Sequence, residues 1–200
     1  SNASSQVTDT ATAIVANVDG ISYLVNGSHR YQLPQEATLR DAFLRAFGIP
    51  ETASTDATAQ WINLFEQGSP IEQISVDGAG NSITVHGVEA LVGSVVMQQG
   101  DAKKTKYVVR SDGSLSPLTD FTYGLYITGK TDEFTQPNVL SAADFQFFSN
   151  STESAIPEDW PSEELSATSG NVSACAIGNG RKEKSRHPCK FSSQTKQLST

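Results

Sequence analysis

One pattern of residue types occurs twice in this chain, and it limits the folds available to the sequence. Residues 23–33 contain an aromatic residue, two aliphatic residues, a turn with glycine and serine, and a leucine before a predicted helix. Residues 107–118 follow the same order, and the segments 15–20 and 95–100, which match each other in role, precede the two copies. One such unit exposes an apolar sheet face and is unstable alone, whereas two units can bury those faces together. The alternative is a chance similarity between two hairpins.

The first copy predicts a three-stranded meander over residues 14–34. Asp19-Gly20 and Asn26-Gly27 separate runs of β-prone residues. Such dipeptides favour type I′ turns, which need positive φ at both central residues. The third strand stops at Pro34, which cannot donate a backbone hydrogen bond.

A helix is predicted over residues 37–47, directly after this meander. Its apolar residues recur at the spacing of one helical face, and Gly48 and Pro50 end it. The second copy predicts a weaker helix, which begins at Thr119-Asp120 and is interrupted by Gly124.

The remaining segments have weaker patterns. We expect a short helix at residues 59–65, extended chain at 71–99, and a helix start at Ser141 within the run 139–148. Residues 156–161 are expected to be extended, with Trp160 as an anchor.

These observations predict an α+β fold in which the repeated hairpin or meander units and their helices pack on a shared, mainly antiparallel sheet. Ser1, Asn2 and Ala3 are typical of residues left after removal of a purification tag. The predicted parts are a tag remnant and flexible lead (1–13), a first repeat (14–50), a connecting helix and extended central segment (51–99), a second repeat (100–128), an irregular C-terminal segment (129–174), and a cysteine loop with a basic tail (175–200).

Charge is distributed unevenly along the 200 residues. The first 180 residues carry 8 basic and 21 acidic side chains, and six of the 14 Lys and Arg residues follow Gly180. An acidic body argues against nucleic acid as a partner. The basic tail is either a solvated run or a contact for phosphate or anionic lipid. No apolar run reaches the length needed to span a membrane.

Cys175 and Cys189 are the only two cysteines, and a glycine-containing segment separates them. In an exported protein this spacing predicts a disulfide, which would contribute roughly 3 kcal/mol by the loop-entropy model. Two unpaired thiols are the alternative. A metal site is disfavoured, because only His187 lies nearby and the spacing matches no zinc pattern.

No catalytic, cofactor-binding or metal-binding residue can be assigned from the sequence. His29 and His86 have neither metal-ligand spacing nor a nucleophile nearby, and residues 178–185 lack the Gly-Lys-Ser/Thr triplet of a phosphate loop. Aromatic residues recur at matching places in the two copies, which favours packing over a sugar-binding platform. The carboxylates without a defensible pairing are Glu36, Asp41, Glu72 and Asp77.

Several of these motifs, taken in order, resemble the EccB family of type VII (ESX) secretion components. The residues that carry the resemblance are the Tyr-Leu-Val strand at 23–25 with the helix ending at Phe47-Gly48, the segment 61–71, the run 92–96 with the second copy, and Trp160-Pro161 with Cys175. The similarity covers about residues 14 to 175. The resemblance further implies that Cys175 pairs with a distant cysteine, whereas Cys189 is the partner available in this sequence.

The resemblance implies a function as an extracytoplasmic structural or interaction domain in an actinobacterium-like cell. It implies an N-terminal transmembrane anchor outside this sequence and other secretion-core membrane components as partners. A second copy of the chain is a further expected partner, and no cofactor is expected. Some family members have been described as ATPases. The alternatives are an exported nucleotide or cell-wall hydrolase and an envelope carbohydrate-binding module, against which burial of Trp61 and Trp160 would argue.

Overall fold

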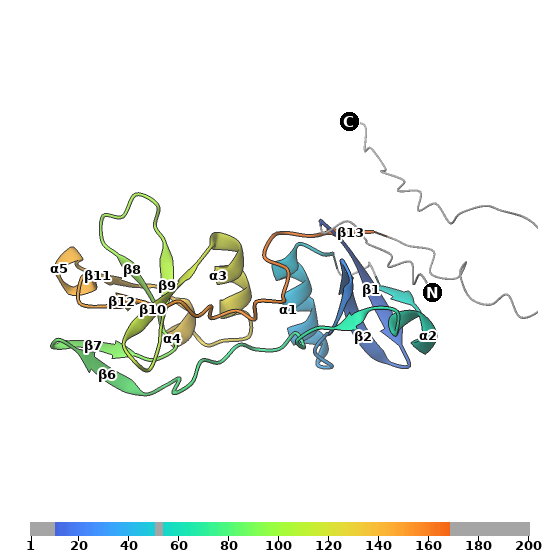
Figure 1. Cartoon of the computed structure of the whole chain (residues 1–200), viewed down its shortest axis with the longest axis horizontal. Coiled ribbons are helices and arrows are strands. Elements are labelled where there is room, and N and C mark those ends of the chain that lie inside the picture. The colour runs from blue at the N-terminus through green and yellow to red at the C-terminus, as the bar shows by residue number, and fades with distance from the viewer. Residues whose placement is uncertain (1–10, 51–53, 169–200) are drawn as a thin grey trace, which may run out of the picture.

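Two meanders of three antiparallel strands, each followed by a helix, form the framework of the computed structural model (Figure 1). The structure describes residues 11–50 and 54–168. The first meander consists of β1 (Thr12–Val18), β2 (Ile21–Asn26) and β3 (His29–Gln32), followed by α1 (Ala37–Phe47). The second consists of β8 (Val95–Gln98), β9 (Lys106–Val109) and β10 (Ser114–Leu118), followed by α3 (Asp120–Ile127).

Short strands extend both meanders by parallel pairing. After α1, β4 (Ser54–Asp56) pairs with β1, and β5 (Glu66–Gln67) follows the short helix α2 (Ala59–Ile62) and pairs with β3. After α3 come α4 (Asp132–Thr135), β11 (Asn138–Leu140) beside β8, α5 (Ala142–Phe145), and β12 (Ser149–Asn150) beside β10. A hairpin of β6 (Ser82–Val85) and β7 (Val88–Leu91) lies between the meanders in sequence, and β13 (Ser166–Ala167) returns to β1.

The α+β class is confirmed, but the prediction of a single shared sheet is wrong. The two meanders belong to separate sheets, and each sheet combines antiparallel pairs with parallel edge pairs. The helices α1 and α3 lie against each other between the two sheets (Figure 1). Each meander buries its inner face on a helix, so the helices separate the sheets instead of covering one common sheet.

The turns and helix ends follow the local sequence. Asp19 and Gly20 adopt φ values of 51° and 84°, as the predicted type I′ turn requires. Glu36 accepts hydrogen bonds from the backbone N–H groups of Thr38 and Leu39 and caps α1. At the other end, Gly48 is left-handed with φ 89° and closes the helix.

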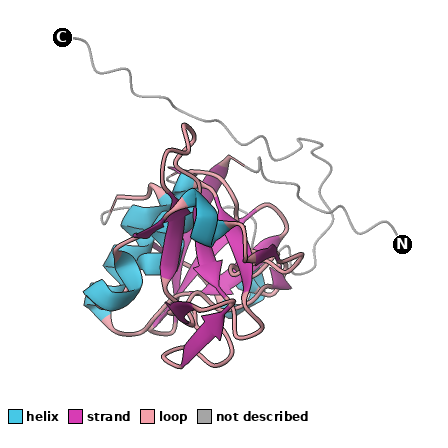
Figure 2. Cartoon of the chain, turned by 90° about the vertical axis from the view of Figure 1, so that its left-hand side faces the viewer, coloured by secondary structure: helices cyan, strands magenta, loops and turns pink. Residues whose placement is uncertain are grey.

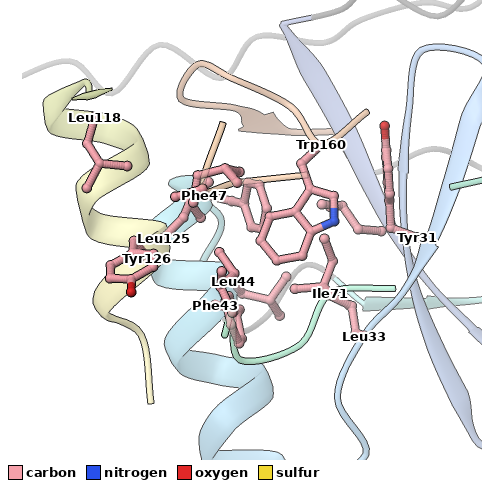
Figure 3. Close-up of a cluster of buried hydrophobic side chains, with 14 of the residues drawn as sticks. Tyr31, Leu33, Phe43, Leu44, Phe47, Ile71, Leu118, Leu125, Tyr126 and Trp160 are labelled. Carbon is pink, nitrogen blue, oxygen red and sulfur yellow. The ribbon is translucent and has the colours of Figure 1, made fainter. Parts of the chain in front are cut away.

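One hydrophobic core lies between the two sheets (Figure 3). Successive strand residues point to opposite faces, so Val15 and Val95 face this shared core, whereas Ala16 and Val96 face separate outer cores. The outer core of the first sheet lies under α2, and that of the second sheet contains side chains of α5 and the β6–β7 hairpin. Figure 2 shows the molecule from the end that carries α5, with one unit behind the other.

Two predicted elements differ in extent from those observed. The predicted helix 59–65 ends at Ile62, because Phe65 enters the outer core and Glu66 then pairs with β3. Residues 71–76 form no strand, although Ile71, Ile74 and Val76 are buried. Among the described residues, no helix is both long and apolar enough to cross a membrane.

Candidate interaction site

Two linkers connect the units, and a trough lies between them. Residues 68–81 lead from the first unit to the second, and residues 151–165 lead back (Figure 1). The trough has a volume of about 630 Å³, and it is lined by Ser69, Pro70, residues 72–75 and 152–158, and Trp160. Buried Ile74, Ala155, Ile156 and Trp160 contribute apolar lining, whereas Glu72, Gln73, Ser75, Thr152, Glu153, Ser154 and Glu158 are exposed.

Hydrogen bonds join the linkers to each other beside the first unit. The backbone N–H of Ser69 donates to the Asp159 carboxylate at 2.6 Å, and Trp160 Nε1 donates to the Ser69 carbonyl at 3.2 Å. The Tyr31 hydroxyl donates to the carbonyl of Asp159. The indole of Trp160 packs near Phe43 and Phe47 of α1, with ring centroids 6.1 and 6.2 Å apart (Figure 3). These contacts therefore anchor the end of the trough near the first unit to the hydrophobic core.

Separate contacts join the linkers to the second unit. Arg110 donates to the Glu153 carboxylate at 2.6 Å and to the Ser116 hydroxyl at 3.2 Å, and Ser116 donates to the Glu153 carbonyl. Lys130 donates to the carbonyl of Ile74 and lies 4.7 Å from the centre of the Tyr126 ring. Each of the two linkers that form the walls of the trough is thus held to the second unit by its own contacts.

The pKa shifts in this region follow from burial and hydrogen bonding. Burial, with the nearby Asp159 charge, raises the pKa of Tyr31 to about 12. Burial acts to raise the pKa of Asp159, but the hydrogen bonds from Ser69 outweigh it and leave that pKa lowered. Burial lowers the pKa of Lys130. These groups form no acid–base pair with each other and instead hold the chain together.

Large exposed apolar side chains lie at both ends of the molecule. Leu64, just after α2, is 75% exposed, and Phe147, just after α5, is 42% exposed. Phe147 stacks on His86 with ring centroids 5.3 Å apart. Val139 on β11 is also exposed, at 59%.

The structure separates the residues that the sequence left as functional candidates. His29 lies 3.5 Å from Glu66, and His86 contacts Phe147 in the other unit. Within 11–50 and 54–168, no group of three or more His, Cys, Asp or Glu side chains is arranged to hold a metal ion. Trp160 is buried and Trp61 half-buried. Cys175, Cys189 and His187 lie outside the described residues.

No sequence pattern predicts the trough. Its lining residues come from positions about eighty residues apart, in segments without helical or strand periodicity. The apolar residues Ile71, Ile74 and Val76 among polar neighbours, together with Trp160 between two prolines, were the available signal. Neither feature indicates that the two segments lie side by side.

Solved structures with the same fold come from type VII secretion. The chain is similar to a chain in a structure of the periplasmic assembly from the ESX-5 inner membrane complex, with a TM-score of 0.64 and 15% identity over 82% of this chain and 39% of that chain. A chain in an intact ESX-5 inner membrane complex gives a TM-score of 0.64 at 17% identity, over 82% and 34%. A chain in an EccB3 dimer from the ESX-3 core complex gives 0.62 at 17%, over 81% and 41%.

The chain thus spans less than half the length of these solved chains. A search of curated protein sequences finds no match. The family model described as type VII secretion system ESX-1, transport TM domain B, matches residues 1–196. That match covers nearly the whole sequence, and the two-sheet fold agrees with it, so the chain belongs to the EccB family of type VII secretion proteins.

Proposed function

We propose that this chain is an extracytoplasmic structural and interaction domain of a type VII secretion membrane component. The family match over residues 1–196 carries the proposal. The solved structures with the same fold are described as a periplasmic assembly, an inner membrane complex and a dimer, which supports the same role. In this proposal an N-terminal transmembrane helix outside the present sequence anchors the domain.

We also propose that the chain contains two copies of one unit, which include the repeats expected at 14–50 and 100–128. Support comes from the pairing order, because in each sheet a later strand runs parallel to the first strand and another runs parallel to the third. In register, His29 pairs with Glu66 and Ser114 with Ser149. Leu64 lies two residues before Glu66, and Phe147 lies two residues before Ser149, so Leu64 and Phe147 occupy equivalent positions in the two units.

The proposed partners are other components of the secretion core and a second copy of this chain. Equivalent exposed residues at the two ends give the molecule two related apolar contact points, Leu64 and Phe147. Residues after each of them, Phe65 and Phe148, are buried in the outer cores, so the exposed side chains cannot turn inward without displacing core residues.

Leu64→Asp in the full-length protein is expected to weaken assembly of the membrane complex while leaving the fold intact. A charge at a buried interface costs desolvation, whereas a side chain that is 75% exposed in the free domain contributes little to its stability. Native electrophoresis of detergent-solubilised membranes measures assembly, and thermal unfolding measures the fold. Gln60→Asp, at an exposed polar position of α2, is the matched control.

A double variant, with both exposed ends changed, tests the role as a whole. Cells that carry Leu64→Asp together with Phe147→Asp should export less of the secreted proteins, in parallel with the loss of the complex. A complex and an export level unchanged from the parent would reject the proposed interaction role of these ends.

A disulfide between Cys175 and Cys189 remains a prediction. Mass analysis of purified protein after alkylation without reductant should show a chain lighter by two hydrogens and no alkylated cysteine. Alkylation of both thiols in protein from an oxidising compartment would contradict the disulfide, and a dimer sensitive to reductant would instead indicate an intermolecular link.

A further inference from the structure

The linker 72–75 has backbone N–H groups that pair with no other described residue. Within the described part of the chain, no hydrogen bond uses the N–H groups of Glu72, Gln73 or Ser75, and the Ile74 carbonyl is the group that accepts, from Lys130. On the opposite wall, the N–H groups of Thr152 and Ser154 are likewise without a partner among the described residues. Buried Ile71 and Ile74 hold the first segment in place.

Unpaired backbone groups on a segment held in place are a template for a further strand. A peptide that adds beside such a segment gains main-chain hydrogen bonds, and its alternate side chains enter the neighbouring hollow. The trough offers a volume of about 630 Å³ beside residues 72–75, with Ile74, Ile156 and Trp160 among its lining residues. An extended five-residue peptide spans about 17 Å, and it requires no rearrangement of either sheet.

The negative charges around the trough favour a basic peptide. Glu72, Glu153 and Glu158 line the trough, and no Lys or Arg is among its described lining residues. Arg110 neutralises Glu153, but neither Glu72 nor Glu158 forms an ion pair within the described residues. The first 180 residues, with 8 basic and 21 acidic side chains, add a negative field of longer range.

We propose that the trough binds an extended basic segment of a partner protein, which pairs with the backbone of residues 72–75 and places cationic side chains beside Glu72 and Glu158. This inference rests on the interaction role proposed above and names the chemistry of one partner. At the first unit, the hydrogen bond from Ser69 to Asp159 joins the two linkers. The peptide is therefore expected to lie along the linkers.

The test uses the full chain and a short peptide of alternating lysine and threonine, blocked at both ends. Calorimetry should show saturable binding that weakens with added salt, because exposed charges are screened. The same peptide, N-methylated at alternate amides, keeps its charge but loses main-chain pairing, and it should bind at least about 10-fold more weakly. In Trp61→Phe, Trp160 is the remaining tryptophan and its fluorescence should change on binding.

Charge-matched variants locate the binding. Glu72→Gln with Glu158→Gln should weaken the peptide about 3- to 10-fold. The control, Glu89→Gln with Glu133→Gln, removes the same charge from exposed positions outside the trough and should leave affinity unchanged. Equal weakening by both pairs, equal binding of the N-methylated peptide, or no binding at all would overturn the proposal.

A last variant distinguishes the partner from the chain's own basic tail. Replacing Arg181, Lys182, Lys184 and Arg186 by glutamine should leave peptide affinity unchanged. A rise of about 10-fold would show that the tail competes for the trough, which would overturn a partner protein as the occupant. If the parent protein binds no peptide but still assembles into the membrane complex, this inference is rejected and the proposed assembly role stands.

Discussion

Phe47→Ala is expected to lower the free energy of unfolding by about 3–5 kcal/mol, the usual cost of removing a large aromatic side chain from a packed core. Phe47 has no exposed surface and packs against Trp160, with ring centroids 6.2 Å apart (Figure 3). It also packs against Phe121 of α3, with ring centroids 6.1 Å apart. It therefore contacts the return linker and the second unit at once. The cavity would loosen the contact between the units as well as α1.

Urea unfolding monitored by circular dichroism measures the decrease in the free energy of unfolding. The control is Phe147→Ala, which removes the same side chain from a position that is 42% exposed and should cost about 1 kcal/mol or less. Because both units share one core, Phe47→Ala should retain a single transition. Two separate transitions in the parent protein, or equal losses for the two variants, would contradict the role assigned to this core.

Gly68→Ala is expected to destabilise the protein by about 1–3 kcal/mol, the cost of overpacking a core position. A Cβ at this position would lie 2.4 Å from Cε1 and 2.6 Å from Cδ1 of Tyr31. The Tyr31 ring is buried and its hydroxyl donates a hydrogen bond to the carbonyl of Asp159, so the ring cannot move away freely. The added methyl would also disturb Ser69, which joins the two linkers.

Gly124→Ala is expected to have the opposite effect, stabilisation, in the same urea unfolding assay. Gly124 lies inside α3, and nothing is within 4 Å of an added Cβ. Alanine should stabilise the helix by about 0.5–1 kcal/mol, because glycine loses more backbone entropy on folding. If Gly68→Ala also stabilised the protein, the close approach of Tyr31 to this glycine would be refuted.

Local sequence was sufficient to predict much of the first unit. The Asp19-Gly20 turn and the helix 37–47 were confirmed, because positive φ at a hairpin and a glycine at a helix end depend on a few neighbouring residues. Thr119 and Ser141 were also confirmed as residues that begin helices, α3 and α5. The family resemblance stated from ordered motifs was confirmed by the match over residues 1–196.

The short parallel strands were beyond prediction for a physical reason. A strand of two or three residues, such as β5 or β12, shows no alternation, and its pairing partner lies tens of residues away. Residues 129–174 were therefore predicted to be irregular, although they contain α4, β11, α5, β12 and β13.

The sequence by itself determined the two meanders, their helices and the residues that turn the chain, since these depend on local conformational preference and on the period of apolar residues. The tertiary structure alone decided that the sheets are separate, that α1 and α3 meet between them, and that two linkers enclose an acidic trough. Contacts such as those between Ser69 and Asp159 join residues about ninety positions apart. Such contacts form because packing both inner sheet faces into one core brings distant segments together. No local sequence pattern indicates which distant segments will meet.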